Sequence, residues 1–403
     1  MADRLLAQAV RAVLRGEPVP AWAWPGDDPA QEVAQTFVAR AEFHGVVGVL
    51  CGSAHSLPEW PSPVTASLRD AARRAALAEQ VETAAIRSLI ERLGQSGIAL
   101  LLLKGAALAY LAYPSPAMRP RGDTDMLIRA ADLAAVRHHL AASGWRRASS
   151  PHTRQLQESW QLECALGIVA VLDLHWQPSE RPVLQKILRE EDFWQGRVVM
   201  PRLGPHVFAP DGLRLLVHGA VNQLWHQTRG VHVAGIRVVD SQRLIWSVDC
   251  HVITARFTPE DWAALIAFCG ECDAGAIVAA ALAQAERTIG LVLPDGLLAQ
   301  LEPASGRSAA FEYITGFDEL ANALADLRAA RGLAERAQIL HHLAVMKREQ
   351  LEERYPHSRH WPTALLHLRR YGGAAARLIG LRPRGRAYHL AAAQARSDRR
   401  GGD

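Results

Sequence analysis

The sequence predicts an α+β fold, in which a small mixed β-sheet with helices packed on it is flanked by N-terminal and C-terminal helical regions. Three observations support this class. Apolar residues recur every three to four positions before residue 95 and after residue 211, as in helices that face a core. Short apolar runs next to glycine indicate buried strands in between. A period of two in the side chains near residue 160 indicates a strand with one covered face.

The N-terminal region contains two helical patterns. The first is an apolar stripe between Asp28 and Leu50. The second begins after Ser62, which suits an N-cap because Pro63 occupies the first helical position, and stops at Gly94. These patterns predict a helical region that ends before the sheet.

The sheet is predicted to begin after this long helix. Residues 98–103 form an unbroken apolar run between two glycines, which suits a strand buried on both faces. A helical composition follows over 106–113, and three prolines then precede a second short strand over 123–128. A helix capped by Asp132 and ended by Gly144 follows.

A hairpin is predicted next. A period of two sets Leu156, Glu158, Trp160, Leu162 and Cys164 apart from the polar residues between them, and a turn at Leu166 and Gly167 leads into the nearly apolar stretch 168–176. The second strand of the hairpin is therefore expected to be central in the sheet. The helical period returns at Asp211 and persists to about residue 376, with breaks near 230–235 and at a proline.

At about 150 residues per domain, 403 residues suggest two to three domains. We expect an N-terminal helical region over 1–96, the sheet-containing core over 97–200, a C-terminal helical domain over 201–376 and a basic, disordered tail over 377–403.

Charge and cysteine usage exclude several classes of protein. The net charge is +4, but the tail alone carries seven Arg and two Asp, which leaves −1 on residues 1–376. A neutral body lacks the basic face of a general nucleic-acid binder, so only the tail could grip a polyanion. The five cysteines are scattered, no apolar run spans a membrane, and the start MADRLLAQAV does not resemble a signal peptide. We therefore expect a cytoplasmic protein.

Carboxylates stand on two of the predicted strands, where buried strands usually carry apolar residues. Asp123 and Asp125 point to one face, as do Asp173 and His175, because side chains alternate along a strand. If these two faces coincide, three carboxylates converge and require a positive partner. A hard divalent cation suits oxygen ligands, so the sequence predicts a Mg²⁺ site that Mn²⁺ could also fill.

A phosphate seat is predicted beside this site. The strand that ends in Lys104 and Gly105 turns directly into a helix, whose free N–H groups and dipole favour an anion, and glycine allows close approach. Lys104 and Arg119 are candidates to neutralise phosphate oxygens. The structural alternatives are a lysine that reaches solvent from a strand end and an arginine that braces its loop by pairing with an acid.

These residues resemble a known family. The run LLLKGAALAYLAYPSPAMRPRGDTDMLI, followed by VLDLHW, is similar to the uncharacterised nucleotidyltransferase family of the DNA polymerase β-type superfamily. The resemblance is close over 98–176 and loose over 30–295. The residues that match the family pattern are Lys104, Gly105, Tyr113, Pro114, Arg119, Asp123, Asp125, Asp173, His175 and Trp176. The residues outside this core that resemble the family's helical segments are His44, His218, Trp225, Arg237 and Asp240.

The resemblance implies transfer of a nucleoside monophosphate from an NTP, with ATP as the expected donor, to an acceptor hydroxyl on a small metabolite or a protein. Asp123 and Asp125 would hold both of two Mg²⁺ ions, and Asp173 the ion that activates the acceptor. Lys104, Gly105, Ala106 and Arg119 would bind the nucleotide. Ala106 stands where the wider superfamily has serine, so one hydroxyl is missing from the phosphate seat.

Two other functions remain open at this stage. A catalytically degenerate relative could bind a nucleotide or another protein, and a kinase could use the same metal site. His175 is either a hydrogen-bond donor near Asp173 or a satisfied buried histidine. Cys269 and Cys272 have redox or zinc spacing but lie in a helical pattern without further ligands, so they are expected to be structural thiols.

Overall fold

The protein is described by a computed structural model. It covers residues 1–22, 31–52, 60–148, 156–233, 236–238, 242–302, 308–316, 319–344, 348, 351–352 and 355–378. The chain forms two compact units. The first comprises Met1–Ala148, Leu156–Ser179 and Leu184–Ile314, and the second comprises Ser149–Gln155, Glu180–Val183 and Thr315–Asp403. The predicted tail lies outside the described residues from residue 379 onward.

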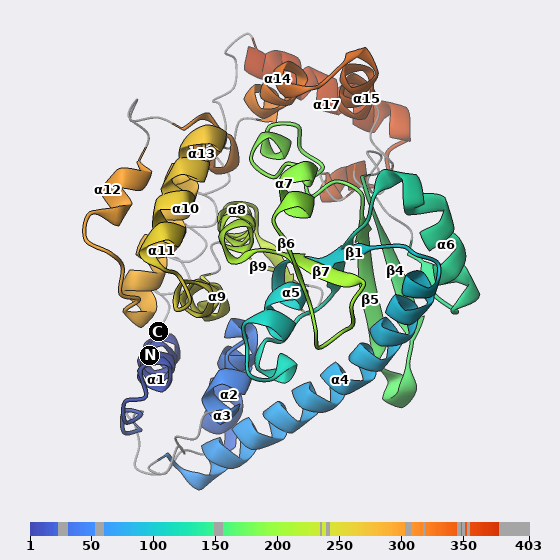
Figure 1. Cartoon of the computed structure of the whole chain (residues 1–403). Helices are drawn as coiled ribbons and strands as arrows, with labels where there is room; N and C mark the ends of the chain where they lie inside the picture. Colours follow the sequence, from blue (N-terminus) through green and yellow to red (C-terminus); the bar gives the residue numbers. More distant parts are fainter. Residues whose placement is uncertain are drawn as a thin grey trace. The chain divides into compact units, whose positions relative to one another are not determined.

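The predicted α+β class is confirmed by a mixed seven-stranded sheet with helices around it, in the first unit (Figure 1). The strand order is β3-β4-β5-β2-β1-β7-β6. The strands are β1 (Leu100–Leu102), β2 (Thr124–Leu127), β3 (Arg146–Arg147), β4 (Gln157–Glu163), β5 (Val169–His175), β6 (Arg197–Val199) and β7 (Val207–Pro210).

The centre of the sheet combines parallel and antiparallel pairs. β2 pairs antiparallel with β1 and parallel with β5, while β1 pairs parallel with β7. β5 lies between β4 and β2, which confirms the expected central position of the second hairpin strand. The turn before it contains Leu166 at φ 62° and Gly167 at φ 72°. β6 and β7 were not predicted, and β7 extends the sheet to Pro210.

The N-terminal region consists of α1 (Ala2–Arg15), α2 (Gln31–His44), α3 (Val47–Gly52) and α4 (Ser62–Gln95). The stripe expected to run to Leu50 is divided into α2 and α3 by Gly45, whose φ of 71° ends the first helix. Ser62 begins α4 but forms no capping bond, and the helix passes Gly94 by one residue. In Figure 1, α4 runs from α2 and α3 at one end to α6 and β5 at the other.

Short helices connect the strands. Their bounds are α5 (Lys104–Leu111), η1 (Pro116–Met118), η2 (Ala130–Asp132), α6 (Leu133–Ala142), η3 (Ala165–Gly167), η4 (Leu184–Lys186) and α7 (Glu190–Gln195). Asp132 precedes α6 as expected, but its side chain makes no capping bond. α5 contacts β1 and β2, so its first turn lies at the sheet.

The chain is mainly helical from residue 212 onward, as predicted. The first unit contains α8 (Gly212–Arg229), the hairpin β8 (Val231–Val233) and β9 (Ile236–Val238), α9 (Leu244–Thr254), α10 (Pro259–Cys272), α11 (Gly275–Ile289), α12 (Leu297–Leu301) and α13 (Ala309–Thr315). The helices of the second unit are α14 (Glu319–Ala329), α15 (Leu333–Ala344), η5 (Pro356–Ser358) and α17 (Thr363–Leu378).

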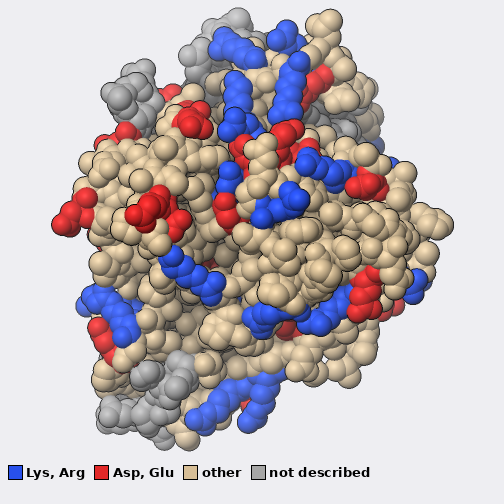
Figure 2. All heavy atoms as spheres, in the orientation of Figure 1, with Lys and Arg blue, Asp and Glu red and all other residues tan. Residues whose placement is uncertain are grey.

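The surface agrees with a body near neutrality. Acidic and basic side chains are interspersed over the face drawn in Figure 2. No helix in the described part of the chain combines the length and the apolar character that crossing a bilayer requires.

Candidate active site

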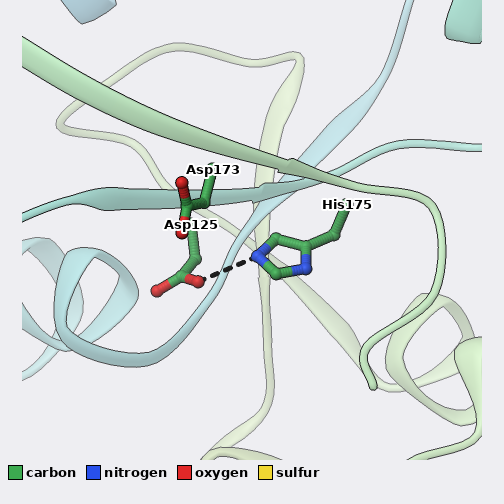
Figure 3. Close-up of side chains that lie close together, drawn as sticks. All are labelled: Asp125, Asp173 and His175. Carbon is green, nitrogen blue, oxygen red and sulfur yellow. Dashed lines mark hydrogen bonds and ion pairs between the residues drawn. The ribbon is translucent and has the colours of Figure 1, made fainter. Parts of the chain in front are cut away.

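The register of two strands forms the centre of the site. β2 and β5 run parallel, and their Cα partners place Asp125 directly opposite Asp173. His175 follows two residues after Asp173, on the same face of β5. One ligand atom from each of these three side chains lies within 4.8 Å of the others, and Figure 3 shows them converging. The expected convergence of strand-borne acids is therefore present for Asp125 and Asp173.

Asp125 is buried and already has two partners. Lys104 Nζ lies 2.6 Å from its Oδ1, and His175 Nε2 lies 2.9 Å from the same atom (Figure 3). Burial alone would raise the pKa of Asp125, but the Lys104 charge and the His175 hydrogen bond outweigh it and hold the pKa well below its usual range. Oδ2 of Asp125 has no hydrogen-bond partner among the described residues, and so remains available to a ligand.

Lys104 is the positive partner that the clustered acids require. The expected strand end is in fact the first residue of α5, since β1 ends at Leu102. Lys104 has φ 48°, a left-handed conformation that costs energy for a residue other than glycine. Burial would lower the pKa of Lys104, but the charges of Asp125, Asp123 and Asp173 raise it overall. The lysine therefore acts as counter-ion to all three carboxylates.

Asp123 differs from the other two acids in its position. It lies immediately before β2, it is exposed, and it is not part of the close cluster formed by Asp125, Asp173 and His175. No hydrogen bond holds its side chain within the described residues. The charge of Asp125 raises the pKa of Asp123 to about 6. The Asp123 carboxylate therefore interacts with the charges of the cluster, but no hydrogen bond to the cluster fixes its position.

The first turn of α5 has the properties expected of an anion seat. The backbone N–H groups of Lys104, Gly105 and Ala106 have no partner among the described residues, and the first amide to bond is that of Ala107, which donates to Leu103. Gly105 is needed for a close contact, because a Cβ there would lie 3.1 Å from Nη1 of Arg119. The Ala106 side chain is buried.

Arg119 is engaged with a carboxylate. Its Nε and Nη2 donate to the two oxygens of Asp249 on α9, each at 2.8 Å, and its Nη1 donates to the Pro120 carbonyl at 2.7 Å. The hydroxyl of Tyr113 donates to Asp249 as well, at 2.7 Å. This geometry favours the bracing role for Arg119, with the guanidinium packed against the phosphate turn at Gly105.

Sequence reasoning missed a second pair of this kind. Arg121 contacts Glu79 on α4, and Oε1 of Glu79 accepts from Tyr110 at 2.8 Å. Both charged side chains are buried, with exposures of 3% for Arg121 and 10% for Glu79. The available signal was a carboxylate on the apolar stripe of α4, seven residues before the buried Ile86.

Residues from the flanking helices are placed as follows. His44 is buried and contacts Asp3 and the Leu244 amide. Trp225 is half-buried on α8, while the Arg237 side chain and Asp240 lie outside the described residues. His218 on α8 is buried, and its Nδ1 has no hydrogen-bond partner in the described part of the chain. Burial and then the Lys104 charge lower the pKa of His218 to about 3, so the ring is neutral and close to the site.

The thiols of the Cys269 and Cys272 pair are free and buried on α10. Burial raises their pKa to about 12 and 11, respectively. High pKa values keep thiols protonated and unreactive, in keeping with a structural role.

Comparison with known proteins agrees with this geometry. A family model described as uncharacterised nucleotidyltransferase matches residues 31–290. The chain belongs to this nucleotidyltransferase family. The match covers the sheet, the acid cluster and the helices from α2 to α11, and makes the protein a transferase of phosphorus-containing groups. Searches of curated proteins and of solved structures found no match.

Proposed function

We propose that this nucleotidyltransferase transfers a nucleoside monophosphate from an NTP, with ATP as the expected donor, to a hydroxyl of a small metabolite or a protein. The observation that carries the proposal is the pairing of Asp125 with Asp173 across parallel strands, next to the first turn of α5. The neutral body favours a small or protein acceptor over a nucleic acid.

The donor set fits hard divalent cations. Oδ2 of Asp125 and the carboxylate of Asp173 lie in one close cluster and have no hydrogen-bond partners within the described residues, and the Asp123 carboxylate, outside that cluster, has none either. We propose that these three side chains hold two Mg²⁺ ions, for which Mn²⁺ can substitute. When bound, the ions supply charge neutralisation at the reacting phosphate. His175 orients Asp125 through the bond to Oδ1.

The protein's own groups then have distinct tasks. The free N–H groups of the first turn of α5 would bind phosphate oxygens, and the Lys104 ammonium group would neutralise them. We assign Asp173 to the acceptor hydroxyl. The acceptor hydroxyl loses its proton to solvent, its oxygen bonds to the α-phosphorus as the bond to the bridging oxygen breaks, and pyrophosphate leaves.

Product analysis with each α-labelled NTP, Mg²⁺ and a cell extract tests the proposal. We expect pyrophosphate release and label on an acceptor, both lost in Asp125→Asn. Asp132→Asn, which alters a carboxylate that makes no capping bond at the start of α6, is the matched control and should behave as the parent. Release of a nucleoside diphosphate would instead identify a kinase. Nucleotide binding without any product would identify the catalytically degenerate binding partner, which the alanine at 106 favours.

A further inference from the structure

Two buried clusters of the same design flank the segment 119–123, which leads into β2. In the first, Glu79 of α4 accepts hydrogen bonds from Arg121 of the segment and from Tyr110 of α5. In the second, Asp249 of α9 accepts hydrogen bonds from Arg119 of the segment and from Tyr113, which follows α5. We name them the α4 anchor (Glu79, Tyr110 and Arg121) and the α9 anchor (Asp249, Tyr113 and Arg119). Each joins a flanking helix to the segment and to α5 or its end.

The α4 anchor also reaches the strand itself. Nε of Arg121 donates to Oγ1 of the buried Thr124 at 3.2 Å. This hydrogen bond joins residues on either side of Asp123. On the α4 side, the hydroxyls of Thr83 and Tyr110 each lie 2.8 Å from Oε1 of Glu79 and 2.5 Å from each other, while Oε2 faces the arginine. A buried guanidinium with this many partners has a single arrangement, because any other leaves a desolvated charge unpaired.

Asp123 is the acid that needs such support. Asp125 and Asp173 are fixed by the ladder between β2 and β5, and Asp125 also by Lys104 and His175. Asp123 precedes the strand, is exposed and has no hydrogen-bond partner for its side chain among the described residues. Its position therefore depends on the backbone on either side, which Arg121 ties to Glu79 and Thr124.

Resting on the proposed function, we propose that the α4 anchor positions Asp123 for cation binding, and that Glu79 and Arg121 are positioning residues of this enzyme. The N-terminal helical region then has a task in the reaction, since α4 provides the fixed point for a cation ligand. Glu79 contributes through Arg121 and makes no contact with substrate.

The test measures Mn²⁺ affinity by electron paramagnetic resonance on the full chain, without nucleotide or acceptor. Glu79→Gln keeps the size of the side chain but removes the charge opposite Arg121. Loss of an outer partner of a metal ligand typically costs about 10–100-fold in affinity, so we expect at least a tenfold weaker affinity. Tyr110→Phe removes one hydroxyl from the same anchor, should fold even if Glu79→Gln does not, and should weaken binding in the same direction.

Glu158→Gln is the matched control. Glu158 is a fully buried carboxylate on β4 that pairs with Arg137 and with Arg147, the latter at 3.0 Å. Its cross-strand partner is Leu174, so it lies on the face of the sheet opposite Asp173. This substitution breaks a buried ion pair of the same kind away from the segment. It should lower the melting temperature and leave Mn²⁺ affinity within twofold of the parent.

A double-mutant cycle with Asp123→Asn separates positioning from general destabilisation. If Glu79 acts through Asp123, Glu79→Gln should have no further effect on Mn²⁺ affinity once Asp123 is replaced. Parent-like affinity in Glu79→Gln and Tyr110→Phe, an equal loss in Glu158→Gln, or full additivity in the cycle would overturn the inference. A parent that binds no Mn²⁺ would instead refute the proposed function, so the two failures are distinguishable.

Discussion

Replacing Lys104 by methionine removes the counter-ion of the acid cluster and keeps the length of the side chain. The ion pair between Lys104 Nζ and Asp125 Oδ1 measures 2.6 Å, with side-chain exposures of 28% and 5%. Breaking a buried pair costs about 3–5 kcal/mol, and we take the lower end because Lys104 is partly exposed and His175 still contacts Asp125. For a unit of the size that holds Lys104, a loss of about 3 kcal/mol lowers the melting temperature by roughly 5 °C.

The backbone at this position gives an internal control. Lys104 adopts φ 48°, which a methionine must also adopt but a glycine tolerates freely. Lys104→Gly should therefore be more stable than Lys104→Met by about 1 kcal/mol, although both lose the ammonium group.

Cation binding should change in the opposite direction from stability. A divalent ion roughly 5 Å from an ammonium group is repelled by about 1.7 kcal/mol even at the dielectric constant of water, which is more than tenfold in affinity. Lys104→Met should therefore bind Mn²⁺ at least tenfold more tightly than the parent, measured by thermal shift against Mn²⁺ concentration. The additional shift from ATP should be smaller than in the parent, because the lysine no longer reaches the phosphates. Unchanged Mn²⁺ affinity, or a melting temperature equal to that of the parent, would refute this account of Lys104.

Three further predictions concern single side chains. Asp123→Asn should raise the melting temperature of the metal-free protein at pH 7, because it removes a charge that Asp125 repels. This gain should shrink as the pH falls through about 6, where the Asp123 carboxyl of the parent becomes protonated. A gain that does not depend on pH between 7 and 4.5 would contradict the raised pKa. Asp173→Asn should keep the thermal shift with Mg²⁺-ATP and lose label transfer; loss of both would show that Asp173 is needed for nucleotide binding. His218→Phe should remove an acid sensitivity of the parent. A histidine with a pKa of about 3 in the folded state costs no stability at pH values above its unfolded pKa of about 6.5, but costs about 2 kcal/mol at pH 5. The free energies of unfolding of the two proteins, measured in urea, should therefore diverge between pH 7 and 5, and parallel curves would exclude a neutral buried His218.

Local sequence determined the elements that carry the site. The apolar run around Leu100–Leu102, the strand that bears Asp125 and the hairpin that bears Asp173 are each recognisable from composition and periodicity, because burial of a strand face dictates its residues directly. The first turn of α5 was also predictable, since a glycine after a strand and before a helix marks such a turn. The predicted catalytic, nucleotide-binding and metal-binding roles of these residues remain proposals.

Tertiary structure decided which strands pair and which residues lie opposite each other in the sheet. β6 is exposed at every residue and β7 ends in a proline, features that do not indicate a strand, yet β7 pairs with β1 in the sheet. The pairing of Asp125 with Asp173 is a matter of register between strands far apart in the chain, and a shift of one residue would have turned one of them to the other face.

The charged partners were equally beyond local reading. Arg121 contacts Glu79, 42 residues away in the sequence, and Arg119 contacts Asp249, 130 residues away. No residue pattern in the sequence indicates pairs so far apart. The sequence by itself determined that acids, a lysine and a glycine turn occur on strands and at a helix start. Only the folded chain determined that Lys104 neutralises Asp125 and that two arginines fasten the segment before β2, because the partner of a buried charge is set by which elements pack together and not by the residues next to it.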